Sequence, residues 1–491
     1  MNVSSLPSPY GIGVFGKETK EWIDRLASMR FSVWQVLPFN VLNVEGSPYG
    51  SCSAFAGNPL YIDPRGVQAM GLATAEDVKA CEYDGTPYTT DYAFARETRM
   101  AFLEKAFKRV DPKTKEAVAA FQSSHPWVRE FALYMAVKES QNETPWWTWD
   151  SSLAAYEQCM KETGPFEARR DFWLFVQYLF FAQWEEIHAY AAEKGIRVLG
   201  DMPIYVSMDS ADVWSHRDLF CIDQRTFRPD KVAGVPPDYF SEDGQLWGNP
   251  LYDWERMKAT GYRWWIDRVK TALELYDSVR IDHFRAFASY WAVPATAKTA
   301  KEGTWEEGPG QELFDAVCAA FDETPSIVAE DLGTFGEDVL ALLESSGFPG
   351  MRVIQFGFDP GSDSTHLPHN YPKNSVAYVG THDNNTLLGW LWEASEEERR
   401  FALEYCGFDG HDWGEGGYRS RSCRRIIETV WKSAADLAII SFQDLCGFGS
   451  DARMNIPGIA EKNWRFRTTK ETIDAMDHAY YAHINRLFRR G

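Results

Sequence analysis

Short apolar runs alternate with amphipathic segments along most of this 491-residue chain. The runs are rich in β-branched and aromatic residues, and Gly, Pro or acidic residues follow them, which is typical of buried β-strands. Strands are therefore expected within Phe31–Phe39, Ile196–Val206, Ser278–Phe287, Ser326–Leu332, Met351–Phe358, Ser375–Asp383 and Ala438–Leu445.

Apolar residues at helical spacing lie between these runs. They predict helices over Tyr262–Leu275, Pro309–Phe321, Gly336–Ser345 and Ser420–Ala435. Repeated strand-then-helix units indicate a parallel sheet, and seven or eight units favour a closed α/β barrel of the (β/α)8 or TIM type. We expect residues 1–491 to form a single catalytic barrel.

Two stretches are too long to be simple connections. Residues 63–194 have a mostly helical pattern, including Trp173–Lys194, and residues 207–261 are rich in turn-forming residues. Long loops in compact proteins are usually functional. We therefore predict a helical insertion subdomain at 63–194 and a loop-rich insertion at 207–261, both on the barrel rim, with the second forming part of a substrate cleft.

Three of the predicted strands end at an acidic residue: Asp282, Glu330 and Asp383. Because barrel strands deliver functional side chains at their carboxyl ends, these three carboxyl groups are expected to meet in one pocket. Glycosidic bond chemistry uses such a set, with one carboxylate attacking and one carboxylic acid protonating the leaving oxygen. Each run alone favours an acidic surface turn, but the three together, with their flanking Arg and His residues, favour the shared pocket.

The neighbouring residues suggest how the acids differ. Arg280 lies two positions before Asp282 and so on the same strand face, where a guanidinium would keep a carboxylate ionised, as a nucleophile requires. The apolar Ile327, Val328 and Ala329 precede Glu330, and their desolvation would raise its pKa, as a proton donor requires. A salt bridge at the barrel end and an ordinary strand-end acid remain the alternatives. Asp331 should point the other way and bond a loop backbone.

Further polar side chains could bind sugar hydroxyls. His382 next to Asp383 offers both a donor and acceptors, and Asp201 ends another predicted strand, where capping of the next turn is an equally good interpretation. Aromatic and amide side chains in loops rich in Gly and Pro are candidate sugar contacts, although each could equally serve loop packing. These are Ser47, Tyr49, Gln245, Trp247, Trp254 and Asn455.

Composition narrows the function further. The formal net charge is −21, which disfavours nucleic acid and anionic lipid as partners but places no penalty on a neutral substrate. Residues 1–7 show no secretory signal pattern and no apolar stretch is long enough for a membrane helix, so a cytoplasmic location is expected. The eight cysteines form no Cys-x-x-Cys pair and indicate reduced thiols, most of them in the core. We expect no metal and no organic cofactor.

Several longer motifs resemble those of the amylomaltases, the 4-α-glucanotransferases or disproportionating enzymes of glycoside hydrolase family 77. They begin with Ser4-Ser-Leu-Pro-Ser-Pro-Tyr-Gly-Ile-Gly13 and end with Arg453-Met-Asn-Ile-Pro-Gly458 and Asn463-Trp-Arg465. Between them lie Ser47-Pro-Tyr49, Ser53–Pro59, Gly200–Val206, Gly234–Phe240, Gly248–Tyr252, Arg280–Arg285, Ala329–Gly333 and Gly380–Asn384.

The resemblance implies a retaining enzyme that transfers a segment of an α-1,4-glucan to the 4-hydroxyl of another glucan or of glucose. It makes Asp282 the nucleophile, Glu330 the general acid/base and Asp383 the transition-state stabiliser. It places Asp201, Arg280 and His382 around the reacting sugar, and Ser47, Tyr49, Gln245, Trp247 and Asn455 at donor or acceptor contacts. It also implies rim insertions and no C-terminal β-sandwich.

Two places depart from the family pattern. Only three residues precede Ser4, so the first barrel strand is expected to be short or incomplete, and Val44 and Gly46 replace residues that are usually aromatic and acidic, so accessory glucan contacts are not expected there. Two other functions are weighed against the transferase. One is a hydrolase of the same clan with the same three acids, and the other is a non-catalytic glucan-binding or scaffold protein, which the intact acids disfavour.

Overall fold

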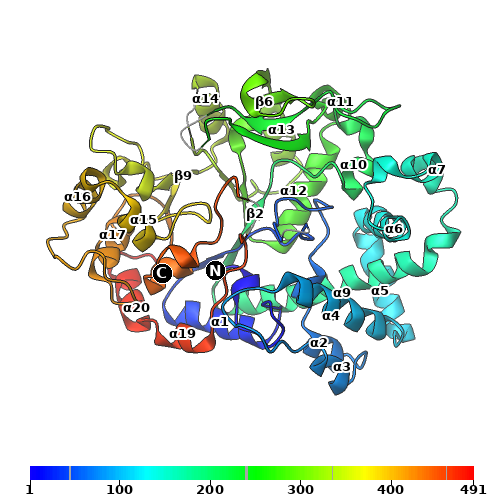
Figure 1. The fold of residues 1–491 in the computed structure, drawn as a ribbon, viewed down its shortest axis with the longest axis horizontal. Helices are drawn as coiled ribbons and strands as arrows, with labels where there is room; N and C mark the ends of the chain where they lie inside the picture. The colour runs from blue at the N-terminus through cyan, green and yellow to red at the C-terminus, as the bar shows by residue number, and fades with distance from the viewer. Residues whose placement is uncertain (44–45, 238–240, 334–335, 460–461) are drawn as a thin grey trace.

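The computed structural model describes residues 1–43, 46–237, 241–333, 336–459 and 462–491. Among these residues, seven parallel strands form the centre of the molecule, in one sheet ordered β1-β2-β5-β8 and another ordered β11-β10-β9 (Figure 1). Their bounds are Val33–Gln35 (β1), Arg197–Met202 (β2), Ser278–Ile281 (β5), Ile327–Ala329 (β8), Gly350–Val353 (β9), Ser375–Tyr378 (β10) and Leu437–Ile439 (β11).

The two sheets continue into one another between β8 and β9. The backbone N–H of Ala329 donates to Pro349 O at 2.9 Å, and the N–H of Met351 donates to the Asp331 carboxylate at 2.5 Å. The strands therefore follow one another as β1-β2-β5-β8-β9-β10-β11, a barrel-type wall. Asp331 does bond a backbone group, but the group belongs to a strand and not to a loop.

Helices cover the outside of this wall. The helix α17 shows why: Ser420 caps its first turn by accepting from Cys423 N, and Ile426, Ile427 and Val430 form a buried stripe at helical spacing. The helices outside the insertions are Lys17–Ser28 (α1), Arg263–Leu275 (α12), Gln311–Cys318 (α13), Glu337–Ser346 (α14), Leu387–Glu393 (α15), Glu396–Tyr405 (α16), Arg421–Trp431 (α17), Phe442–Cys446 (α18), Lys470–Ala475 (α19) and His478–Leu487 (α20). The predicted helices match α12, α13, α14 and α17.

The predicted strands were found, but most are shorter than expected. The apolar run after β5 continues into a 3-10 turn at Phe284–Phe287, the run after β9 into one at Ile354–Gly357, and the run after β11 into helix α18. These turns are buried, so their apolar residues satisfy the same hydrophobic pattern as a strand. Hydrophobicity therefore located each strand but not its end.

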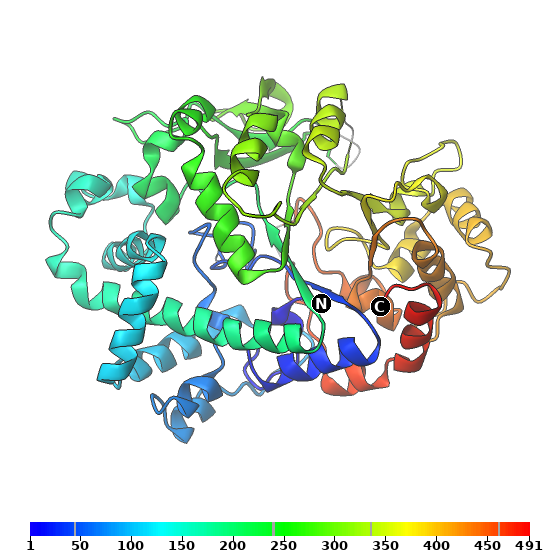
Figure 2. The ribbon, with the colours of Figure 1, turned by 180° about the vertical axis from the view of Figure 1, so that it is seen from behind.

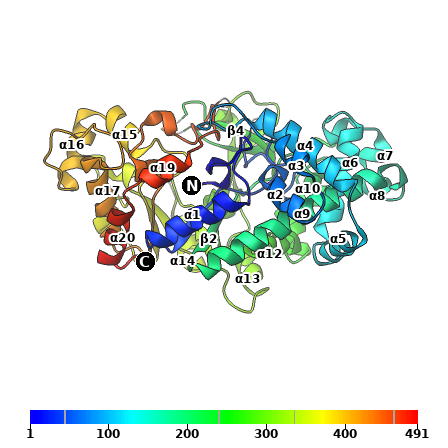
Figure 3. The same ribbon diagram turned by 90° about the horizontal axis from the view of Figure 1, so that it is seen from below.

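Residues 63–194 are mostly helical, as predicted. They contain α2 to α9, at Pro64–Ala69, Ala75–Lys79, Tyr92–Phe107, Pro112–Ser124, Trp127–Ser140, Ser151–Ala154, Tyr156–Cys159 and Glu167–Glu193. These helices lie together on one side of the barrel strands (Figure 3). The long helix α9, which includes the predicted segment Trp173–Lys194 up to Glu193, runs along the barrel (Figure 2).

In residues 207–261, turns and loops connect several short helices and strands. These residues include α10 (Ala211–Ser215), α11 (Trp254–Ala259) and strands β3 (Lys231–Val235) and β4 (Gln245–Pro250). An antiparallel sheet ordered β4-β3-β6-β7 joins them to β6 (Ser289–Pro294) and β7 (Thr304–Glu307). Strand β3 pairs with β4 inside this segment and with β6 outside it. Residues 238–240 of the Gly234–Phe240 motif lie outside the described residues.

Within the described ranges, no helix has both the length and the apolar character needed to cross a membrane. The eight cysteines are free thiols, and Cys81, Cys159, Cys406, Cys423 and Cys446 are buried, as the sequence indicated. Among the residues that the structure describes, no group of three or more His, Cys, Asp or Glu side chains is placed to hold a metal ion. The absence of a cofactor stays a prediction.

The packing of strand β2 yields a stability prediction. A Cβ atom added at Gly200 would lie 2.1 Å from the Tyr276 ring, and the Tyr276 hydroxyl is held in place by the backbone N–H of Phe39. We expect Gly200→Ala to destabilise the fold by about 1–3 kcal/mol through overpacking. The measurement is the melting temperature, with Gly164→Ala as the control because no atom lies within 4 Å of its added Cβ. Equal melting temperatures for the two variants would contradict the prediction.

Candidate active site

Parallel strands bring two of the three predicted acids together. Asp282 directly follows β5 and Glu330 directly follows β8, and the two strands pair with Ile281 opposite Ala329. The ladder continues past the strand ends, because Glu330 N donates to Ile281 O at 3.0 Å. The two acids therefore lie side by side at the carboxyl end of the barrel, where active sites of this fold lie.

Arg280 bonds two carboxylates, those of Asp282 and Asp201. Its Nη2 donates to Asp282 Oδ1 at 2.9 Å, and its Nη1 donates to both carboxylate oxygens of Asp201 at 2.7 and 2.8 Å. The Arg280 and Asp201 side chains are only 4% and 1% exposed, whereas Asp282 keeps 27% exposure. Asp282 is thus anchored on one oxygen and partly exposed, and it shares a strand face with Arg280, as the strand periodicity predicted.

The sequence analysis expected Asp201 to contact a hydroxyl or to cap a turn. The structure instead places it inside strand β2, with its oxygens occupied by Arg280 and by the Tyr49 hydroxyl at 2.7 Å. In this structure the Asp201 carboxylate orients Arg280 and Tyr49, and its place around the reacting sugar stays a prediction.

Backbone N–H groups fix the carboxyl group of Glu330. Oε2 accepts from His283 N and Oε1 accepts from Leu332 N, both at 2.7 Å. His283 adopts a left-handed conformation with φ 50°, which is uncommon for a residue other than glycine. The residue after Asp282 is therefore held in an unusual conformation and bonds Glu330. Strain of this kind is concentrated at functional sites.

The two acids differ in their electrostatic surroundings. Burial, reinforced by the negative charge of Asp282 and opposed by Arg280, raises the pKa of Glu330 to about 7. Burial also raises the pKa of Asp282, and Arg280 opposes this shift. Asp282 has the direct bond to the guanidinium and the greater exposure, so it loses its proton first. The sequence predicted the raised pKa of Glu330. It expected Arg280 to keep Asp282 ionised, and Arg280 does lower the pKa of Asp282, but burial outweighs this effect.

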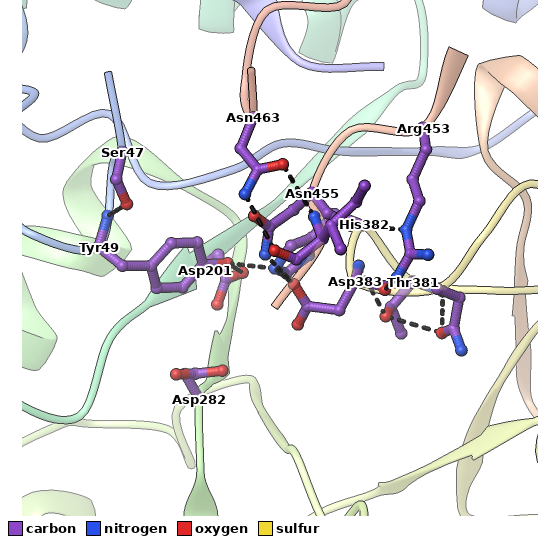
Figure 4. A network of polar contacts seen from close by, with 12 residues as sticks. Ser47, Tyr49, Asp201, Asp282, Thr381, His382, Asp383, Arg453, Asn455 and Asn463 are labelled. Atoms are coloured by element: carbon purple, nitrogen blue, oxygen red, sulfur yellow. Dashed lines mark hydrogen bonds and ion pairs between the residues drawn. The ribbon is translucent and has the colours of Figure 1, made fainter. Parts of the chain in front are cut away.

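Asp383 reaches the site from the loop after β10. Its Oδ1 accepts from Asn455 Nδ2 at 2.5 Å and lies 3.4 Å from His382 Nε2, while its side chain keeps 43% exposure. His382 Nε2 also lies 3.1 Å from the Tyr49 hydroxyl, and the two rings stack with centroids 5.4 Å apart. Figure 4 shows these side chains in one network with Asp201, with Asp282 nearby.

The remaining predicted contacts come from the rim. Gln245 and Trp247 lie on β4, where Trp247 Nε1 donates to Gln245 Oε1 at 3.1 Å. The Trp247 ring lies 4.9 Å from the His283 ring, which brings this insertion to the catalytic strand β5. Ser47 accepts from Tyr49 N and so shapes the loop that carries Tyr49. Trp254, by contrast, packs against Tyr252 and Trp265.

Sequence reasoning missed two residues that support Asp383. Arg453 donates from Nη2 to the backbone O of Asp383 at 2.5 Å and from Nε to Asn455 O at 2.8 Å. Asn463 bonds the backbone of Ile456 and Ile459 and closes the same loop. Both residues lie in motifs that the sequence displays, but nothing in their spacing connects them with an acid 70 residues earlier.

Comparison with known proteins agrees with this site. The sequence model of glycoside hydrolase family 77, described as 4-alpha-glucanotransferase, matches residues 1–472. The chain is 42% identical to a 4-alpha-glucanotransferase of Thermus thermophilus over 484 residues, which covers 95% of this chain and 93% of the relative. A 4-alpha-glucanotransferase of Clostridium butyricum is 40% identical over 474 residues, covering 95% of each chain.

A solved structure leads to the same conclusion. The amylomaltase of Streptococcus agalactiae in complex with acarbose superposes with a TM-score of 0.95 at 35% identity, covering 100% of this chain and 98% of that one. The fold and the comparisons define a glycosyltransferase with a TIM-barrel-type fold. The chain belongs to glycoside hydrolase family 77, the 4-alpha-glucanotransferases.

The raised pKa of Glu330 predicts the pH dependence of activity. A group that must donate a proton is active below its pKa, so kcat/KM should fall as the pH rises through about 7. The acid limb should follow ionisation of the Asp282–Glu330 pair, with both apparent values belonging to the pair. A pH–rate profile checks this. Activity that already declines above pH ~5, near the ordinary pKa of a glutamate, would contradict it.

The contacts of Arg453 predict a positioning role. Arg453→Ala should lower kcat by roughly 10-fold or more with a smaller change in KM, because it frees the backbone that carries Asp383. Arg453→Lys should recover part of the loss, since an ammonium can still donate to one carbonyl. Exposed Arg400 supplies the control, Arg400→Ala. If the Ala and Lys variants lose kcat equally while their melting temperatures fall, Arg453 supports only the fold.

Proposed function

We propose that this 4-alpha-glucanotransferase works by a retaining double displacement. Asp282 attacks the anomeric carbon of an α-1,4-glucan, while Glu330 gives its proton to the leaving oxygen, and a covalent glucosyl-enzyme forms. Glu330 then takes the proton from the 4-hydroxyl of the incoming glucan or glucose, whose oxygen displaces Asp282. Two inversions restore the α-linkage.

One observation supports these roles above the others. Among the described residues, the Asp282 carboxylate bonds the Arg280 guanidinium, whereas the Glu330 carboxyl group accepts from two backbone N–H groups and has a pKa raised to about 7. When two carboxyl groups have such different surroundings, the one with the raised pKa is assigned as the acid and the ionised one as the nucleophile. A retaining enzyme also needs carboxyl groups about 5–5.5 Å apart, a spacing that adjacent strands can provide.

Asp383 is proposed to stabilise the transition state. Its exposed carboxylate, fixed by Asn455 and flanked by His382, can accept from two hydroxyls of the reacting sugar whose bonds strengthen as charge develops. Arg280 and His382 are proposed to lie around the same sugar. Ser47, Tyr49, Gln245, Trp247 and Asn455 are proposed to form donor and acceptor contacts or to orient the loops that do.

The substrates are proposed to be α-1,4-glucans, namely maltooligosaccharides, amylose and glycogen chains. Transfer must exceed hydrolysis, and the region from Gly234 to Trp254 is placed to favour it. Trp247 is 37% exposed and lies against His283 beside the nucleophile. An acceptor sugar stacked on its ring would exclude water from the glucosyl-enzyme. Residues 238–240 of this region lie outside the described residues.

We further propose that residues 1–491 act as one catalytic unit. The barrel carries residues 63–194 and 207–261 as insertions on its rim, without a β-sandwich after β11 within this chain. Two contacts support the second insertion as part of the cleft: Trp247 approaches His283, and Asn249 Nδ2 donates to Val206 O at 2.8 Å beyond the end of β2.

Maltotriose alone distinguishes transfer from hydrolysis. A transferase should release glucose and form longer oligosaccharides in a chromatographic time course, because a second maltotriose acts as the acceptor. Trp247→Ala should raise the share of hydrolysis, whereas Trp392→Ala, at another exposed Trp on α15, should not. Reducing sugar without longer products would instead indicate the rival hydrolase.

Substitution of the nucleophile tests the mechanism. Asp282→Ala should reduce transfer by several orders of magnitude while glucan binding stays measurable, because only the attacking oxygen is lost. Azide can enter the space left by the carboxylate and should give a β-glucosyl azide, the product of a single inversion, identified by NMR. Retention of roughly a tenth of the activity would exclude this nucleophile. A non-catalytic glucan-binding protein would show no activity to lose.

A further inference from the structure

One face of the antiparallel sheet carries two neighbouring tryptophan side chains. Trp291 on β6 pairs directly with Trp305 on β7, so the two side chains project from the same face. Their ring centroids lie 5.0 Å apart, with 64° between the ring planes. The opposite face of β6 carries Tyr290 and Ala292, which are buried, whereas Trp305 is 44% exposed. The sheet thus packs on the molecule through one face and presents an aromatic ring to solvent on the other.

The two rings are held in place by their neighbours. Trp291 Nε1 donates to Ala300 O at 2.8 Å, and a Cβ atom added at Gly303 would lie 2.2 Å from the same nitrogen. The Arg285 guanidinium lies 4.0 Å from the centroid of the Trp305 ring, a cation–π distance. The exposed ring is therefore pre-organised, and a ligand that stacks on it would lose little affinity to the ordering of side chains.

Polar groups surround this aromatic pair. Ser289 pairs with Glu307 two positions further along the same strands, and so both project from the face of the tryptophans. Ser289 Oγ donates to Asp338 Oδ2 at 2.8 Å, in the first turn of α14, which lies next to β6 in Figure 1. Glu307 is exposed. The face therefore combines aromatic rings with a hydroxyl, two carboxylates and a guanidinium.

This combination of groups fits a carbohydrate. A pyranose presents a C–H face that can stack on an indole ring, and the hydroxyls at its edge both donate and accept hydrogen bonds. Asp338 and Glu307, together with the net charge of −21, disfavour phosphate-bearing ligands such as nucleic acid or anionic lipid. An uncharged sugar chain meets no such penalty.

Arg285 connects this face with the catalytic strand. It follows Asp282 by three residues, which span at most about 11 Å of chain, and its guanidinium contacts Trp305. The aromatic face therefore lies on the barrel rim close to the end of β5. A glucan that is too long for the cleft can extend over the rim to this face.

We propose that Trp305, supported by Trp291, forms an auxiliary binding site for long α-1,4-glucan chains. One glucose unit stacks on the exposed indole, and its hydroxyls bond Ser289 and Glu307 at the edge of the ring. The ligand class rests on the proposed substrates of the enzyme. A chain that occupies both this site and the cleft binds more tightly than either contact alone allows, because the second contact becomes intramolecular. Maltotriose is too short to gain from it.

Affinity electrophoresis in gels that contain amylose tests the site without catalysis, in chains that also carry Asp282→Ala. We expect Trp305→Ala to weaken amylose binding roughly 10-fold, which corresponds to the loss of about one stacked ring. Trp305→Phe should keep most of the affinity because it keeps an aromatic face. Trp392→Ala, which removes a similarly exposed Trp from α15, is the matched control and should bind as the parent does. With Asp282 intact, Trp305→Ala should leave kcat and KM for maltotriose unchanged.

Equal retardation of the Trp305→Ala and Trp392→Ala chains by amylose would overturn the proposal and leave the exposed ring to a different partner, such as a protein. A loss of kcat with maltotriose as large as the loss with amylose would overturn it too, because Trp305 would then act through Arg285 on the catalytic strand. If Trp305→Ala does not fold, Trp305→Thr replaces it, since Thr suits an edge strand. Residual transfer by Asp282→Ala would contradict the proposed nucleophile but leave this comparison intact, so the two proposals fail separately.

Discussion

Arg280 bonds two carboxylates, those of Asp201 and Asp282, from a position inside the barrel that is 3% exposed. A buried guanidinium without partners would cost several kcal/mol, so its charge must be matched by buried acids. Asp201 supplies one match and is itself held by Tyr49. Asp282 is the second partner, and its bond to Arg280 also orients its carboxylate toward the cleft. The bonds of Arg280 therefore both balance the buried charge and fix the position of the proposed nucleophile.

The same bonds of Arg280 make the ionisation of the two carboxyl groups, Asp282 and Glu330, different. Because Arg280 bonds Asp282 directly and only influences Glu330 at longer range, the negative charge settles on Asp282 and adds to the burial that keeps a proton on Glu330. The backbone N–H of His283 links the two residues, since it follows Asp282 in the chain and bonds Glu330 in space. A shift of one strand against the other would disturb the ionisation of both. The register of β5 against β8 thus determines the protonation states on which the proposed reaction depends.

Much of this could be predicted from the sequence, because the residues of each barrel strand and the acid at its end are consecutive in the chain. The apolar runs before Asp282 and Glu330 gave the strands, their common end and the raised pKa of Glu330. Contacts between distant segments were not visible. The β3–β6 pairing, the burial of Asp201 under Tyr49 and the support of Asp383 by Arg453 each join residues far apart in the chain.

The central claim is that Asp282 carries the sugar between the two displacements. Mass spectrometry of enzyme quenched after reaction with a 5-fluoro-α-glucosyl fluoride tests it most directly, because the fluorine slows both steps and a good leaving group lets the first proceed. The account predicts one added fluoroglucosyl mass on the peptide that contains Ser278–Arg285, localised to Asp282, and none in Asp282→Ala. A label on Glu330 or Asp383, or complete turnover with no labelled enzyme at any time, would contradict the account.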